Sequence, residues 1–168
     1  GNKNAITYKE IFPLIKDNKL WLGFSQPKEF DTPNGMTKKV NGLTRWFTNV
    51  DTKKRHHKLE TVYRWRKRKE KYPDLYPKFD NYDVIDIDKV LQIPLDYTGM
   101  MGVPITFLDK YNPDQFEILD ARKYTKLDRL KAKHTALIKD KDSSINGKPK
   151  YARITIKNKH PEDYQNDL

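Results

Sequence analysis

A run of concentrated positive charge at residues 53–71 most constrains how this chain can fold. It holds ten lysines and arginines against two glutamates, a net charge of +8. Charged side chains are almost never buried without partners, so the run must lie at the surface and the core must come from the apolar stretches around it. The segment that follows, residues 72–120, carries a net charge of −7, and the basic excess is therefore local.

The composition indicates a folded protein with a small core. The chain has 168 residues, 36% of them hydrophobic and 34% charged, which suits about one domain. Ten tyrosines, seven phenylalanines and three tryptophans argue against disorder, because aromatic side chains bury large areas. The absence of cysteine excludes disulfides, thiolate zinc sites and cysteine nucleophiles. No apolar run approaches the about 18 residues of a membrane span and no signal-peptide pattern is present, so we expect a soluble, intracellular-type protein without a membrane partner.

Local patterns in the first part of the chain predict a mixed α/β fold. A capping box at residues 7–10 predicts a helix that begins near Tyr8, although Pro13 is awkward inside a helix. The wholly apolar run 20–24 is typical of a buried parallel strand. Residues 25–42, rich in proline, glycine and asparagine, are expected to form a loop.

Two further segments predict a hairpin that carries the basic run. Residues 44–48 are predicted to form a strand, and residues 58–66 alternate apolar and polar side chains with a period of two, which favours a strand over a helix. Pairing of these two strands would place residues 53–57 at an exposed tip. The arginines at positions 64, 66 and 68 would then share one strand face.

Positive charge with interleaved aromatic residues is the pattern expected of a contact with a nucleic-acid backbone. The alternatives are a solvated basic face without a partner, and an anionic membrane or acidic partner. The residues expected to make the nucleic-acid contact are Lys53, Lys54, Arg55, Lys58, Arg64, Arg66 and Arg68.

The remainder of the chain predicts further short elements. An Asn146-Gly147 dipeptide predicts a tight turn, and the last residues form a polar tail. Strands are predicted at 82–88, 103–108, 116–119 and 151–156, with a helix at 122–134.

The residues by themselves contain no convincing catalytic set. The four histidines are scattered and do not predict a metal site. Asp86, Asp88 and Lys89 resemble the acidic pair and lysine of metal-dependent nucleases, but Lys89 would point to the opposite face of the strand, which favours two exposed strand carboxylates. Asn112-Pro113-Asp114 is typical of an ordinary turn rather than a base-holding loop.

Several blocks together resemble one family. They include Trp21-Leu-Gly-Phe-Ser and Thr44-Arg-Trp-Phe-Thr-Asn. The others cover residues 4–16, 76–83, 102–113 and 145–154. In this order they are similar to the C-terminal half of the EcoRI-type adenine-specific DNA methyltransferases, the modification partners of restriction systems. Since the chain opens at Gly1 in the middle of such a pattern, we expect it to be a fragment.

The resemblance implies methyl transfer from S-adenosylmethionine to N6 of adenine in double-stranded DNA, in the bacterial cytoplasm. It also implies that the cofactor and catalytic loops lie in the missing N-terminal half of the methyltransferase, so we expect this fragment to hold no catalytic residue and no metal, to bind no cofactor and to be inactive alone. Residues 1–43 would form the C-terminal portion of a Rossmann-like methyltransferase sheet. Residues 44–120 would form a β-rich, basic DNA-recognition region with hairpins, and residues 121–168 a helix, a β-hairpin and a polar tail.

The resemblance also suggests residues that face the target base. Trp46 and Phe47 lie where related methyltransferases place a base-stacking aromatic side chain, although an ordinary core pair in a strand is the alternative. Asn2 and Asn4 are candidates for the rim of the active site. Two other functions stay open, a self-sufficient DNA-binding module without enzymatic activity and a restriction-type nuclease domain.

Overall fold

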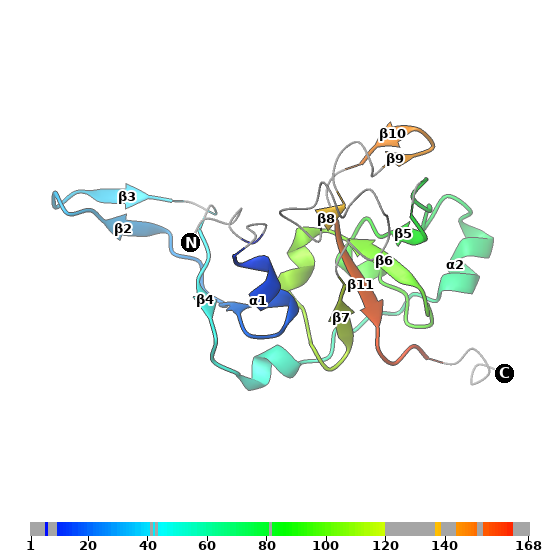
Figure 1. Cartoon of the computed structure of the whole chain (residues 1–168), viewed down its shortest axis with the longest axis horizontal. Coiled ribbons are helices and arrows are strands. Elements are labelled where there is room, and N and C mark those ends of the chain that lie inside the picture. Colours follow the sequence, from blue (N-terminus) through cyan, green and yellow to red (C-terminus); the bar gives the residue numbers. More distant parts are fainter. Residues whose placement is uncertain are drawn as a thin grey trace. The chain divides into compact units, whose positions relative to one another are not determined.

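The computed structural model describes most of the chain (Figure 1). The chain divides into two compact units, residues 1–51 and 52–168. No helix among the described residues is long and apolar enough to cross a membrane. The described residues are 6, 10–40, 42, 44–80, 82–119, 137–138, 144–150 and 153–162.

The first unit begins with helix α1, Phe12–Lys16. The predicted start near Tyr8 lies outside the described residues. The described helix begins at Phe12 with Pro13 in its first turn, where the missing amide hydrogen costs nothing. Phe12 and Ile15 form its buried side. The helix ends before Asn18, whose φ of 59° is left-handed, and the amide of Lys19 donates to the Leu14 carbonyl at 2.8 Å.

Strands β1, Trp21–Leu22, and β4, Phe47–Thr48, pair with each other. The pairing is antiparallel, so the prediction of a parallel strand at residues 20–24 is wrong. The ladder continues past the strands, since the Gly23 amide donates to the Trp46 carbonyl at 2.8 Å. A Cβ atom at position 23 would lie 2.9 Å from the Trp46 Cβ, and glycine therefore permits this close approach.

The predicted loop at residues 25–42 contains a β-ribbon instead. Strands β2, Glu29–Asp31, and β3, Thr37–Lys39, pair antiparallel and extend away from α1 and β4 in Figure 1. At the turn, Gly35 adopts a φ of 74°. The side chains of both strands are exposed. The sequence therefore has no alternation of apolar and polar residues here from which strands could be predicted.

The second unit is built on a five-stranded sheet of mixed direction. Its strand order is β5-β6-β11-β7, and β8 also pairs with β11. Only the β5–β6 pair is parallel. The strands are β5, Val84–Asp86; β6, Met100–Val103; β7, Phe116–Ile118; β8, Leu137–Ile138; and β11, Arg153–Asn158.

Most strands predicted for this unit are confirmed. Strands β5 and β7 fall within their predicted ranges, and β11 lies two residues later than predicted. The strand predicted at 103–108 is wrong, because β6 ends at Val103 and a 3₁₀ helix, η4, follows at Ile105–Asp109. Pro104 lies between the two elements and cannot donate to a ladder. The helix predicted at 122–134 lies outside the described residues.

The Asn146-Gly147 turn is confirmed. It joins β9, Ser144–Ile145, to β10, Lys148–Pro149, and both turn residues have positive φ values, 51° and 72°. The Asp80 carboxylate accepts hydrogen bonds from both turn amides at 2.8 and 2.9 Å.

The fold as a whole is mixed α/β with several small sheets. The Rossmann-like sheet stays a proposal.

The predicted hairpin between residues 44–48 and 58–66 is wrong. Strand β4 pairs with β1, and the chain after residue 52 forms a 3₁₀ helix, η2 (Lys53–His56), and later helix α2 (Trp65–Lys71). Between η2 and α2 the chain is extended, so buried and exposed side chains alternate: Leu59 is 7% exposed and Val62 is 79% exposed. Its hydrogen bonds go to the Gln115 side chain and to the Leu95 amide rather than to a strand partner.

A buried ion pair ties the sheet together. The Arg153 Nε on β11 lies 2.9 Å from the Asp86 Oδ1 on β5, and both side chains are at most 10% exposed. Asp86 is thus not the exposed carboxylate that its position predicted, while Asp88 is 72% exposed. Gly102 on β6 lies between the two strands, and a Cβ there would be 3.2 Å from the Arg153 Cβ. Glycine leaves room for the arginine to cross β6.

Replacing Asp86 by alanine should lower the free energy of unfolding by about 3–5 kcal/mol, because the Arg153 guanidinium would stay buried without its partner. The matched control is Asp88→Ala, which removes an exposed carboxylate 3.9 Å from the same arginine and should cost less than about 1 kcal/mol. Urea denaturation followed by tryptophan fluorescence measures both. Equal losses in the two variants would contradict the assignment.

Candidate nucleic-acid interface

Helix α2 presents the densest part of the basic run, and contacts from distant residues hold it. The amide of Trp65, its first residue, donates to the Asp96 Oδ1 at 2.6 Å, so a carboxylate stabilises the helix N-terminus. The Trp65 ring lies 5.3 Å from the Tyr97 ring. Burial is the main cause of a raised pKa for the Tyr97 hydroxyl. Just before the helix, the Arg64 guanidinium pairs with Glu162 at 2.9 Å.

The helix has an inner and an outer side. Trp65, Arg68 and Lys69 are half-buried, whereas the other four side chains of the helix are exposed. Lys69 donates to the Pro73 carbonyl at 2.6 Å, which fixes the chain that leaves the helix. The exposed side holds Arg66, Lys67, Glu70 and Lys71, a net charge of +2.

A cleft of about 470 Å³ lies beside the inner side of α2 and combines a cation with aromatic rings. The Arg68 guanidinium carbon is 4.1 Å from the Tyr63 ring centroid and 5.9 Å from the Tyr72 centroid. Aromatic rings beside an arginine can stack on bases, while the cation can attract phosphates. The cleft is lined by Tyr63, Arg68, Tyr72, Asp74, Leu75 and Gln92.

Tyr76 supports the cleft from the core. It is 2% exposed, and its hydroxyl donates to the Gln92 carbonyl at 2.6 Å. Burial, followed by the nearby Tyr63, raises the pKa of the Tyr76 hydroxyl far above its usual value. The hydroxyl therefore stays protonated and keeps this hydrogen bond throughout the physiological range.

The other end of the basic run is anchored to the turn at residues 112–115. The His56 Nδ1 lies 2.6 Å from the Asp114 Oδ2, and the side-chain amide of Asn112 donates to the His56 carbonyl. Gln115 accepts from the Leu59 amide and donates to the Leu59 carbonyl, at 2.8 and 3.1 Å. Within the segment, the Asp114 amide donates to the Asn112 side-chain oxygen at 2.9 Å and the Gln115 amide donates to the Asn112 carbonyl at 3.1 Å, which confirms the predicted turn.

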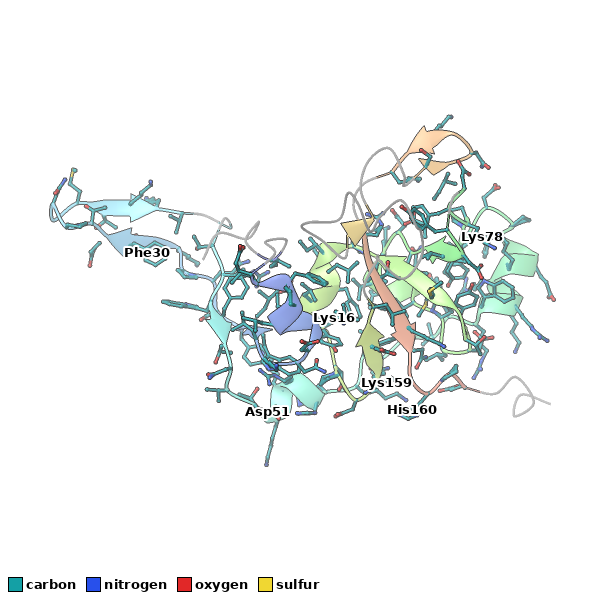
Figure 2. All side chains as sticks on the ribbon, in the orientation of Figure 1. Lys16, Phe30, Asp51, Lys78, Lys159 and His160 are labelled. Atoms are coloured by element: carbon teal, nitrogen blue, oxygen red, sulfur yellow. The ribbon has the colours of Figure 1, made fainter. Side chains whose placement is uncertain are left out.

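A second pocket, of about 390 Å³, lies beside this anchor. Its lining combines His56 and Asp114 with His160 and Glu162 near the end of the described chain, and His160 is labelled in Figure 2. No group of three or more metal-binding side chains occurs among the described residues.

The structure does not bring the predicted basic residues onto one face. Arg64 is extended and paired with Glu162, Arg66 is exposed on α2, and Arg68 lines the cleft. Arg55 is only 8% exposed and has little surface to offer a ligand. Lys53, Lys54 and Lys58 are exposed.

Two exposed cations, Lys67 and Lys71, were missed because a strand was expected. Residues 65–71 contain no β-branched residue and consist mainly of good helix formers, and this signal favoured a helix over the strand that the period of two predicted.

In the first unit, Trp46 is 52% exposed and Phe47 on β4 is half-buried. Asn2 and Asn4 lie outside the described residues.

Comparison with known proteins identifies the family. The family model for the adenine-specific methyltransferase EcoRI matches residues 1–159. The Type II methyltransferase M.EcoRI of Escherichia coli is 41% identical over 176 residues, which cover 95% of this chain and 49% of the relative. The Type II methyltransferase M.MpnI of Mycoplasma pneumoniae is 37% identical over 179 residues, which cover 94% of this chain and 54% of the relative. No solved structure matches the chain.

Both of these relatives are named as type II methyltransferases. It belongs to the family of the adenine-specific methyltransferase EcoRI, as the resemblance indicated. The chain spans about half the length of the curated relatives it matches.

If the exposed side of α2 contacts phosphates, replacing Arg66, Lys67 and Lys71 by alanine should flatten the salt dependence of duplex binding. Each lost contact lowers the slope of log K against log salt by about one unit. Fluorescence anisotropy with a labelled duplex at several salt concentrations measures the slope. The control replaces Lys78, Lys89 and Lys110, which are exposed in the acidic segment and change the net charge equally. An equal effect of both sets would mean that only the net charge matters.

Proposed function

We propose that this chain is the DNA-binding C-terminal part of an S-adenosylmethionine-dependent adenine N6 DNA methyltransferase of a bacterial restriction-modification system. One observation carries the proposal. The family match extends over nearly the whole chain, yet the chain corresponds to only about half of each relative. The cofactor and catalytic loops then belong to the other half of the parent enzyme, and the half formed by this chain binds double-stranded DNA.

The charge arrangement supports the DNA-binding role. Helix α2 exposes three cations on one side, and the adjacent cleft holds Arg68 over the Tyr63 ring, with Tyr72 further away. Cations that contact phosphates supply affinity without reading sequence, and an aromatic-lined cleft accepts a base or sugar that leaves the helical stack. Lys53, Lys54 and Lys58 extend the same role along the basic run.

We assign the roles within the parent enzyme as the sequence suggested. Residues 1–43 complete a Rossmann-like sheet with strands of the missing half, and residues 44–120 form the basic recognition region. Residues 121–168 close the chain with a helix, a hairpin and a polar tail. The parent enzyme works in the bacterial cytoplasm, where its DNA substrate lies.

Isothermal titration calorimetry tests this division of roles. We expect this chain to bind a short duplex and not to bind S-adenosylmethionine. Clear cofactor binding would show that the missing loops are not needed and would overturn the division between the halves. Absence of duplex binding would overturn the DNA-binding role.

A self-sufficient DNA-binding module would give the same titration result, so a second observation separates the two functions. An Asn-Pro-Pro-Phe catalytic loop encoded shortly before Gly1 supports the methyltransferase. A gene without this loop would leave DNA binding as the function.

Trp46 is our candidate for stacking on the flipped adenine, with Phe47 beside it. Enzymes that modify a base extrude it from the duplex and hold it between aromatic or apolar side chains. In the full-length enzyme, replacing Trp46 by alanine should reduce the fluorescence rise of 2-aminopurine at the target position, and the same measurement applies to Phe47→Ala.

The matched control for Trp46 is Phe24→Ala, because Phe24 belongs to the same unit and is equally exposed, 53% against 52%. Unchanged fluorescence in both the Trp46 and the Phe47 variants would end the stacking assignment. A loss equal to that of the Phe24 variant would indicate general damage to the unit.

A further inference from the structure

The strands of the ribbon formed by β2 and β3 contribute no buried side chain to the core of their unit. All six strand side chains are exposed, and the two strands pair only with each other. Figure 2 shows Phe30 on this ribbon, beyond the side chains that surround α1. An isolated two-stranded ribbon is marginally stable in water. A ribbon that exposes a phenylalanine therefore points to a ligand outside the unit.

The register gives the ribbon two chemically different faces. Directly opposed residues share a face, so Glu29 and Lys39 lie on one face with Asp31 and Thr37. The Thr37 hydroxyl donates to the Asp31 carboxylate at 3.2 Å, which confirms that these two side chains meet. Both carboxylates of the ribbon are on this face.

The second face is apolar and cationic. Phe30 lies opposite Lys38, and the ladder continues beyond the strands in both directions. The Val40 amide donates to the Lys28 carbonyl, and the Thr32 amide donates to the Met36 carbonyl, both at 2.8 Å. The same alternation brings Lys28 and Met36 onto the face of Phe30. Phe30 is 40% exposed and Met36 is 64% exposed, and this face carries two positive charges and no carboxylate.

We propose that the face formed by Lys28, Phe30, Met36 and Lys38 enters the major groove of the DNA duplex. The proposal rests on the DNA-binding function proposed above and adds the element that reads the duplex. The major groove admits a two-stranded β-ribbon, and it exposes the thymine methyl group to apolar side chains. Phe30 and Met36 contact the base edges, while Lys28 and Lys38 reach phosphates on the groove walls. The carboxylates point away from the DNA.

The decisive experiment is a photocrosslink that reports only the major groove. The whole chain is bound to a duplex in which 5-bromouracil replaces thymine, so that the bromine occupies the position of the methyl group. Irradiation, trypsin digestion and mass spectrometry then locate the crosslink. We expect it in the peptide from Glu29 to Lys38, which trypsin releases by cleaving after Lys28 and Lys38, and we expect its loss in the double variant Phe30→Ala, Met36→Ala.

A charge pair within the ribbon provides an independent control. Lys38 and Lys39 are adjacent but lie on opposite faces. The double variant Lys28→Ala, Lys38→Ala should lower the salt slope of duplex binding by about two units, whereas Lys39→Ala should leave it unchanged. Equal slopes for Lys38→Ala and Lys39→Ala would mean that neither face is selected, and would overturn the proposal.

The outcomes separate this proposal from the proposed function. A duplex that binds but crosslinks only outside residues 29–38 overturns the ribbon assignment and leaves the DNA-binding function standing. Failure to bind any duplex overturns both. A concentration-dependent dimer in sedimentation velocity that is lost in the Phe30 variant, with no crosslink in the ribbon, would assign the face to a second copy of the chain instead.

Discussion

The larger unit depends on the buried contact between Arg153 and Asp86. Strand β5 pairs with β6 in the sheet, and its other edge forms an isolated antiparallel bridge between Ile85 and Lys78. The ion pair ties β5 across β6 to the central strand β11. The amide of Asp86 also donates to the Pro77 carbonyl, and the neighbouring Phe79 belongs to a buried cluster with Tyr82, Val84 and Ile145. Without the ion pair, a buried guanidinium would stand unpaired in the middle of the sheet. The segment between α2 and β5 would then lose the strand that it contacts.

The acidic segment serves as internal support for the basic one. Residues 72–120 carry a net charge of −7, and several of their carboxylates form contacts within the unit. Asp96 accepts from the first amide of α2, Asp114 pairs with His56, and Asp80 holds the β9–β10 turn. Carboxylates engaged in such contacts repel a phosphate backbone less than free ones, and the lysines and arginines of residues 53–71 keep a cationic surface.

Under the proposed DNA-binding function, the two units offer different chemistry. The larger unit presents cations and a stacking cleft, which suit phosphates and an unstacked base. The smaller unit presents a narrow ribbon and an exposed tryptophan, which suit a groove and a base. Phosphate contacts position a protein on DNA and base contacts select the sequence, and under the proposed function the two units divide these tasks.

The sequence by itself determined the features that depend on local chemistry. A run with a charge of +8 had to lie mainly at the surface, and Asn146-Gly147 had to turn because both residues tolerate positive φ. The period of two after residue 58 predicted a strand, and this prediction is wrong because the extended stretch has no strand partner and α2 begins at Trp65. The family followed from blocks of residues in order. Tertiary structure decided where each extended or helical segment found its partners: β4 pairs with β1, α2 begins where Asp96 accepts its first amide, and Asp86 is buried because Arg153 reaches it over Gly102. These choices rest on hydrogen bonds and ion pairs between residues far apart in the chain, and periodicity within one segment carries no information about the other partner.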